Sequence, residues 1–139
     1  MMVKTISDLM TTDVLAITLD STMADVHAKM KEHHIRHIPV LDEGKFFGVI
    51  TQKNVLAKTM YLLDRYGVSA LQRREKQVSV EELVDKDVMF ANGNMPVTDA
   101  ARFFLNNRHG CLPVVDDDNN LLGIVTSSDF VRLSLMLLE

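Results

Sequence analysis

Two short stretches of the chain place hydroxyl groups close to a carboxylate or an amide. Gly123–Asp129 is GIVTSSD, and Gly48–Asn54 is GVITQKN. In each stretch apolar residues lead to a threonine and, three residues later, to Asp or Asn, a pattern typical of a buried strand that leads into a helix. Side-chain oxygens at a helix N-terminus cap free backbone N–H groups, and such a terminus also attracts anions. The pattern predicts either helix caps alone or an anion-binding site.

Three histidines are the next residues whose spacing could serve a chemical function, here metal binding. His33 and His37 are four residues apart with His34 between them, and that spacing on a helix would suit zinc. The helix must end before the strand that contains Pro39, because the residue before a proline disfavours helix. We therefore expect histidines at a helix end and no metal site. The sequence contains no GxSxG elbow, no P-loop and no recognisable nucleophile–base pair, so we expect no catalytic residues.

Composition narrows the possible classes of protein. The chain has 139 residues, 47% hydrophobic residues and a formal net charge of −4, which suit a compact fold and disfavour binding to nucleic acid. The first residues, MMVKTISDLM, lack the apolar core of a signal peptide, and no apolar run is long enough to span a bilayer. A single cysteine, Cys111, suits a reducing compartment. We expect a cytoplasmic protein that binds neither membrane nor nucleic acid.

The elements that must position these residues follow from a repeat. Most of the chain consists of two copies of one sequence pattern, in which Pro39 corresponds to Pro113 and Thr51 to Thr126. Each copy predicts an extended segment, a helix, a hairpin and a second helix. In the first copy we expect these elements at 14–17, from about 21, at 38–41 with 46–50, and at 52–65. In the second copy the hairpin strands are expected at 112–115 and 121–125.

The turns of the two hairpins also differ in a predictable way. The first turn contains Gly44 and the second Asn119 and Asn120, residues that tolerate positive φ. The acidic run Asp116–Asp118 invites comparison with a calcium loop, but the ligand spacing and the distal glutamate of such a loop are missing. We predict a plain polar turn.

The repeat predicts an α/β (α+β) fold of two β-α-β-β-α motifs, with residues 1–66 as the first motif, 67–79 as the connection and 80–139 as the second. Neither half has enough apolar surface for a large core alone, so we expect the halves to pack about a pseudo-twofold axis into one module. The residues expected in its shared core are Val40, Val49, Ile50, Val114, Ile124 and Val125.

The two copies resemble a tandem pair of cystathionine-β-synthase-type (CBS) motifs, a Bateman module, here as a stand-alone small protein. The resemblance is carried by DLMTTDV from Asp8, IPVLDEGKFFGVITQKN from Ile38 and LPVVDDDNNLLGIVTSSD from Leu112. It implies a regulatory module without catalysis or cofactor, which binds an adenine nucleotide (AMP, ADP or ATP) or an adenosyl compound between its motifs and modulates an unidentified protein. The alternative is a ligand-free interaction or scaffold protein with the same fold.

The same resemblance assigns residues to a nucleotide site. Thr126 should contact phosphate, Asp129 should hold the ribose hydroxyls, and Ile124 should lie near the base. The opposite edge of this cleft should come from the first motif, at Thr18, Arg36, His37 and Ile38.

A second possible nucleotide site departs from the family pattern. It would comprise Thr51, Asn54 and Cys111, where Asn54 replaces the expected Asp and Cys111 stands where the first motif has a basic residue. A neutral amide loses the charge-assisted bond to a ribose hydroxyl. We expect this site to be weaker or to suit another ligand.

The last helix predicts a homodimer. From Asp129 onward one face carries Phe130, Leu133 and Leu137, and another carries Val131, Leu135 and Leu138. One apolar stripe suffices to cover a core, and a second one on a soluble chain usually marks a partner. The resemblance likewise implies association through the helices of the motifs, including the C-terminal one. The alternative is that the inter-repeat segment covers this helix.

Overall fold

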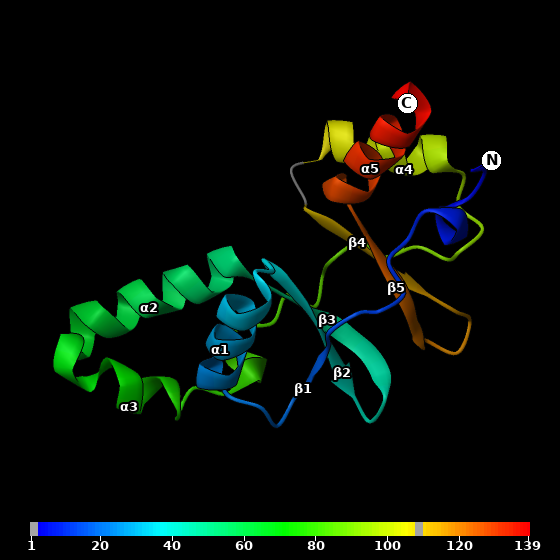
Figure 1. Cartoon of the computed structure of the whole chain (residues 1–139). Coiled ribbons are helices and arrows are strands. Elements are labelled where there is room, and N and C mark those ends of the chain that lie inside the picture. The colour runs from blue at the N-terminus through cyan, green and yellow to red at the C-terminus, as the bar shows by residue number, and fades with distance from the viewer. Residues whose placement is uncertain (1–2, 108–109) are drawn as a thin grey trace. The chain divides into compact units, whose positions relative to one another are not determined.

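The protein was analysed as a computed structural model, which describes residues 3–107 and 110–139. The chain divides into two compact units (Figure 1). The central unit is Leu15–Val88, and the terminal unit combines residues 1–14 with Met89–Glu139. Each unit contains helices and strands, so the fold is α+β as predicted.

The central unit is built on a three-stranded sheet. Its elements are β1 (Ile17–Thr18), α1 (Met23–His33), β2 (His37–Asp42), β3 (Lys45–Thr51), α2 (Gln52–Tyr66), η2 (Val68–Ala70), α3 (Leu71–Glu75) and η3 (Val80–Glu82). The strand order is β1-β2-β3, with β1 parallel to β2 and β2 antiparallel to β3. Glu43 and Gly44 both have positive φ in the hairpin turn, which confirms the conformation predicted for Gly44 and matches the twist of the strands.

Local sequence sets the ends of the helices. Thr22 precedes α1, and its N–H donates to Asp25 Oδ2 at 2.9 Å, which closes a capping box. Gly67, with φ of 80°, ends α2 as the sequence predicted. The face of α1 predicted to be apolar, Met23, Val26 and Met30, is buried. These features place α1 and α2 against the sheet and form the central core.

The terminal unit has a two-stranded antiparallel sheet. Its elements are η1 (Ile6–Asp8), α4 (Val97–Asn106), β4 (Cys111–Val115), β5 (Leu121–Thr126) and α5 (Ser127–Leu138). The strand predicted to open the second motif is reduced to one parallel bridge between Ala91 and Val114, because the turn-forming run Asn92–Asn94 follows directly. Asn119 takes positive φ in the hairpin turn, one of the two options predicted.

Each unit is completed by the segment that opens the other sequence copy. In the terminal unit Ile6 N–H donates to Met95 O at 2.9 Å, and Val97 N–H donates to Lys4 O at 3.0 Å. The central unit repeats this arrangement, because Met23 N–H donates to the carbonyl of residue 78 at 2.9 Å. The first residues of each sequence copy therefore pack in the unit that the rest of the other copy forms.

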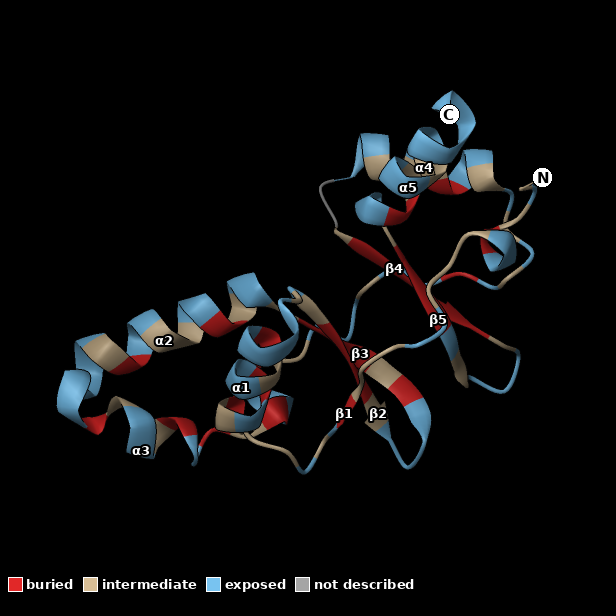
Figure 2. Ribbon diagram, viewed as in Figure 1, coloured by how far each residue is buried: buried red, intermediate tan, exposed pale blue. Residues whose placement is uncertain are grey.

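Burial follows the predicted pattern in both units (Figure 2). All six residues predicted for the core are buried, at 9% exposure or less. Val40 and Ile50 belong to the core cluster of the central unit, and Val114 and Val125 belong to the core cluster of the terminal unit. Over the described ranges, 3–107 and 110–139, no helix is both long and apolar enough to cross a bilayer.

Candidate functional site

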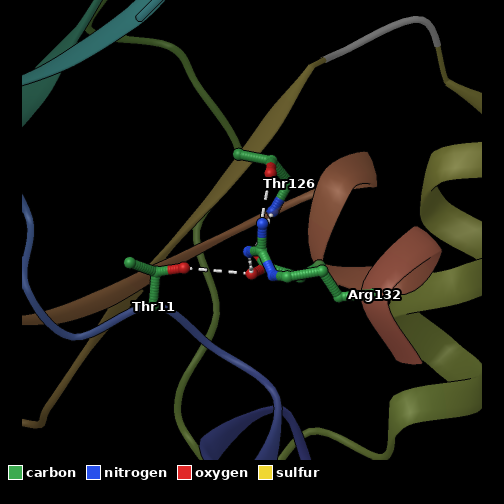
Figure 3. A network of polar contacts seen from close by, with 4 residues as sticks. Thr11, Thr126 and Arg132 are labelled. Carbon is green, nitrogen blue, oxygen red and sulfur yellow. Dashed lines mark hydrogen bonds and ion pairs between the residues drawn. The ribbon is translucent and has the colours of Figure 1, made fainter. Parts of the chain in front are cut away.

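Asp129, the residue predicted to hold a ribose, lies at the start of α5 and is only 3% exposed. Its carboxylate accepts from the Thr126 N–H at 2.8 Å through Oδ2 and from the Thr11 hydroxyl at 3.0 Å through Oδ1. Arg132 Nη2 also donates to Oδ1 (Figure 3). Burying a carboxylate is unfavourable unless donors surround it, and here the backbone, a hydroxyl and a guanidinium supply them.

Thr11 reaches this carboxylate because the N-terminal segment pairs with β5. Thr11 and Ile124 exchange two backbone hydrogen bonds of 2.9 Å. Gly123, the preceding residue of β5, permits this approach: a Cβ there would lie 2.8 Å from the Thr11 carbonyl oxygen. The first glycine of the GIVTSSD stretch therefore positions a donor that the stretch itself does not contain.

Sequence reasoning did not find these two donors. Thr11 is 118 residues from Asp129, so no local pattern could indicate the contact. Arg132 follows Asp129 by three residues on a helix, the spacing of a favourable ion pair, and this signal was available. Within the terminal unit Ile124 is buried at 9% exposure, and Thr126 precedes α5 as its N-cap.

The central unit has the equivalent cap with different chemistry. Thr51 N–H donates to Asn54 Oδ1 at 3.0 Å, and Asn54 N–H donates back to Thr51 Oγ1 at 3.1 Å. Asn54 thus satisfies the helix terminus as Asp129 does. Its surroundings explain the change from carboxylate to amide.

The residues around that cap would not support a buried negative charge. Asp85 pairs with Val49 in the position that Thr11 takes opposite Ile124, so an acid replaces a hydroxyl donor. Three residues after Asn54 the helix carries Ala57 where α5 has an arginine. A carboxylate at residue 54 would lack its cation, and the amide is the better cap there.

Three predicted site residues lie beside this second cap. The register of β2 and β3 pairs His37 with Thr51, and the Gln52 N–H donates to Arg36 O at 2.8 Å. Burial, followed by the nearby Arg36 charge, lowers the pKa of His37 below its usual value of 6.5. Ile38 is fully buried in the central core. The strand register therefore brings Arg36 and His37 to the Thr51 end of their own unit.

Thr18 and Cys111 have local roles in the structure. The Thr18 hydroxyl donates to the Asp20 carboxylate and is the main cause that lowers the pKa of Asp20. Cys111 pairs with Thr126 in the terminal unit, whereas Thr51 and Asn54 lie in the central unit. Cys111 is 3% exposed, and burial raises its pKa to about 12. Its thiol is a small core group.

Comparison with known proteins identifies the family. The family model of the CBS domain matches this chain twice, at residues 6–61 and 80–135. The chain therefore belongs to the CBS domain family. The protein YhcV of Bacillus subtilis (strain 168), a CBS domain-containing protein, is 29% identical over 126 residues, which cover 91% of this chain and 82% of YhcV.

Two solved CBS structures with bound adenosyl compounds are similar to this chain. CBSX2, solved in complex with AMP, has a TM-score of 0.79 and 25% identity, and the match covers 97% of this chain and 98% of CBSX2. The CBS domain pair of MJ0100, solved with 5′-methylthioadenosine and S-adenosyl-L-methionine, has a TM-score of 0.72 and 27% identity, with 93% of this chain and 94% of that one covered. These ligands belong to those proteins.

Proposed function

We propose that this protein is a regulatory module that binds an adenine nucleotide (AMP, ADP or ATP) or an adenosyl compound and thereby modulates a partner protein. The observation that carries the proposal is the buried Asp129 carboxylate at the α5 terminus, surrounded by exchangeable donors. The AMP, methylthioadenosine and S-adenosylmethionine bound by similar structures favour the same ligand class. Catalysis by this chain is not part of the proposal.

Binding of the ribose would proceed by exchange of donors at Asp129. A carboxylate has about four acceptor positions, and four donors from Thr126, Thr11 and Arg132 already contact that of Asp129. The Arg132 side chain is 65% exposed, so it can move into water while a ribose hydroxyl replaces it on Oδ1. Such an exchange conserves the number of hydrogen bonds to the buried carboxylate. The free-energy cost of displacing Arg132 is therefore low. Thr126 and the backbone donors of the α5 terminus would hold phosphate.

The remaining assigned residues keep proposed roles. Arg36 can provide charged donors for phosphate, and Thr18, His37 and Ile38 keep the nucleotide-binding role that the family resemblance assigns to them. A second, weaker site would involve Thr51 and Asn54 of the central unit. The neutral Asn54 amide, which already caps α2 with Thr51, supports weaker ribose binding there.

A ligand-free scaffold is the second candidate function. The specific observation in its favour is that the donors within the terminal unit already satisfy Asp129. The fold therefore does not require a ligand to stabilise this buried charge.

We propose a homodimer that associates through the helices of the motifs, including α5. On α5 the side chains of Val131, Leu135 and Leu138 are 67%, 58% and 85% exposed. They repeat at helical spacing on one face, and an exposed apolar stripe of this kind favours a protein partner. A monomer mass in light scattering at micromolar concentration would refute the dimer.

A thermal-shift panel with AMP, ADP, ATP, S-adenosylmethionine and NADH tests the proposed ligand class. A ligand at 100 times its dissociation constant adds about 2.7 kcal/mol to the free energy of unfolding, or roughly 8 °C in Tm for a chain of this size. At least one adenosyl compound should produce such a shift, and Asp129→Asn should reduce it. No shift with any compound at millimolar concentration would leave the scaffold as the function.

A further inference from the structure

The central unit contains a hollow that shares only Arg36 with the proposed nucleotide site. It has a volume of about 560 Å³ and lies between α1, the residues that follow it and the first turns of α2. Four of its lining residues are basic: His27, Lys31, His34 and Arg36. No Asp or Glu lines it among the described residues. We call it the α1–α2 hollow.

The positive charge of the α1–α2 hollow is largely uncompensated. His27 Nδ1 lies 3.0 Å from Glu75 Oε1, which fixes the imidazole at the α3 side. Lys31, His34 and Arg36 form no ion pair within the part of the chain that the structure describes. The α2 N-terminus adds its positive dipole end, because Gln52, its first residue, also lines the hollow. An anion placed here would meet the charges of Lys31 and Arg36 and the positive end of the α2 dipole.

The other lining residues are apolar. Met30 and Val55 are buried at 7% and 5% exposure, and Leu56 is 57% exposed. Small-molecule sites typically combine an apolar wall with a few polar groups that fix the orientation of the ligand. This combination favours a ligand with an anionic head and an apolar body over a bare inorganic anion.

His34 provides a further, independent indication. It ends α1 in the left-handed conformation, with φ of 53° and ψ of 43°. Glycine adopts this conformation without steric cost, whereas a residue with a Cβ does not. A strained conformation kept by an exposed side chain at a hollow suggests that the side chain has a use there.

We propose that the α1–α2 hollow binds a small organic phosphate monoester with an apolar body. Lys31, His34 and Arg36 hold the phosphate together with the α2 terminus, and Met30, Val55 and Leu56 contact the body. All of these residues belong to the central unit, and of them only Arg36 also has a role in the proposed nucleotide site.

The test is an NMR titration of the full-length protein with phenyl phosphate as the probe, beside inorganic phosphate and phenol. Phenyl phosphate should shift backbone amide signals of residues 30–36 and 52–59 and bind more tightly than either control compound. Raising the salt concentration from 0.05 to 0.3 M should weaken it, because exposed charges are screened. Equal affinity for inorganic phosphate, or shifts confined to other residues, would overturn the proposal.

Substitutions assign the contacts. Lys31→Gln should weaken phenyl phosphate binding about two- to fivefold, as expected for an exposed charge contact. Lys53 is an exposed lysine at the start of α2 that does not line the hollow. Lys53→Gln should therefore leave the affinity unchanged. His34→Gly should raise the thermal stability yet weaken binding. Equal affinities for Lys31→Gln and Lys53→Gln, or unimpaired binding by His34→Gly, would contradict the assignment.

Discussion

The hydrogen bond between Thr11 and Asp129 gives the most direct test of how the terminal unit is held together. Asp129→Ala removes the acceptor for the Thr126 N–H and for the Thr11 hydroxyl and leaves Arg132 unpaired. Loss of a helix cap costs about 1 kcal/mol, and loss of a hydrogen bond to a charged group about 1.5–3 kcal/mol. Because such terms overlap, we expect a total loss of about 2–4 kcal/mol in the free energy of unfolding.

Asn54→Ala is the matched control in the central unit. It removes only the cap at Thr51, since no arginine follows on α2 and Asp85 stands in the position equivalent to Thr11. The expected loss is about 1 kcal/mol. Urea denaturation monitored by circular dichroism measures the stability of both variants. Equal losses in the free energy of unfolding would show that the contacts of Asp129 with Thr11 and Arg132 contribute nothing.

A double-mutant cycle isolates the contact itself. Thr11→Val keeps the shape of the side chain and removes the hydroxyl, and the Asp129→Asn background removes the charge that it meets. We expect a coupling energy of about 1 kcal/mol between the two substitutions. Additive effects, within about 0.3 kcal/mol, would refute the view that Thr11 stabilises the buried carboxylate. The same two variants, titrated with AMP, test whether Asp129 also holds a ligand: we expect tenfold or greater weakening for Asp129→Asn.

Three further predictions follow from other contacts. Gly123→Ala should lower the free energy of unfolding by about 1–3 kcal/mol in urea denaturation, because its Cβ would lie 2.7 Å from Met10 Sδ and 2.8 Å from the Thr11 carbonyl oxygen; wild-type stability would contradict this packing. His37, whose pKa is lowered mainly by burial, binds protons more readily in the unfolded chain. Stability that is present above pH 6.5 should therefore fall as the pH decreases through the lowered folded pKa, and His37→Gln should flatten this part of the profile. Cys111, with a pKa of about 12, should react with iodoacetamide at pH 8 only after denaturation; rapid labelling of the native protein would show that the thiol is accessible.

Local sequence predicted the features that depend on neighbouring residues. The caps at Thr51 and Asn54, the turn at Gly44 and the end of α2 at Gly67 each follow from residues within one turn. The apolar face of α1 follows from helical spacing. These features fix the elements that carry the candidate site, so the family pattern was visible before any tertiary contact was known.

Features that depend on distant residues were not predictable. The inter-repeat connection contains α3, whose Glu75 is buried against His27, a residue 48 positions away. A charged residue in a polar connection gives no sign of such burial. The strand expected before α4 is only a single bridge, because the residues that follow it form a turn although the repeat predicts a strand. In both cases tertiary context decided the outcome.

The exchange of opening segments couples the Asp129 carboxylate to the N-terminal segment of the chain. Thr11 belongs to the first sequence copy but contacts an acid of the second, through a segment that is held by backbone bonds to Ile124. A ligand that replaced Thr11 or Arg132 at Asp129 would weaken the attachment of residues 4–11 or free the α5 arginine, and each change alters a surface beyond the ligand itself. By linkage, a partner that binds only one of these arrangements must change the affinity for the ligand by the same factor. Asn54 lacks both donors, so the equivalent cap in the central unit has no such coupling.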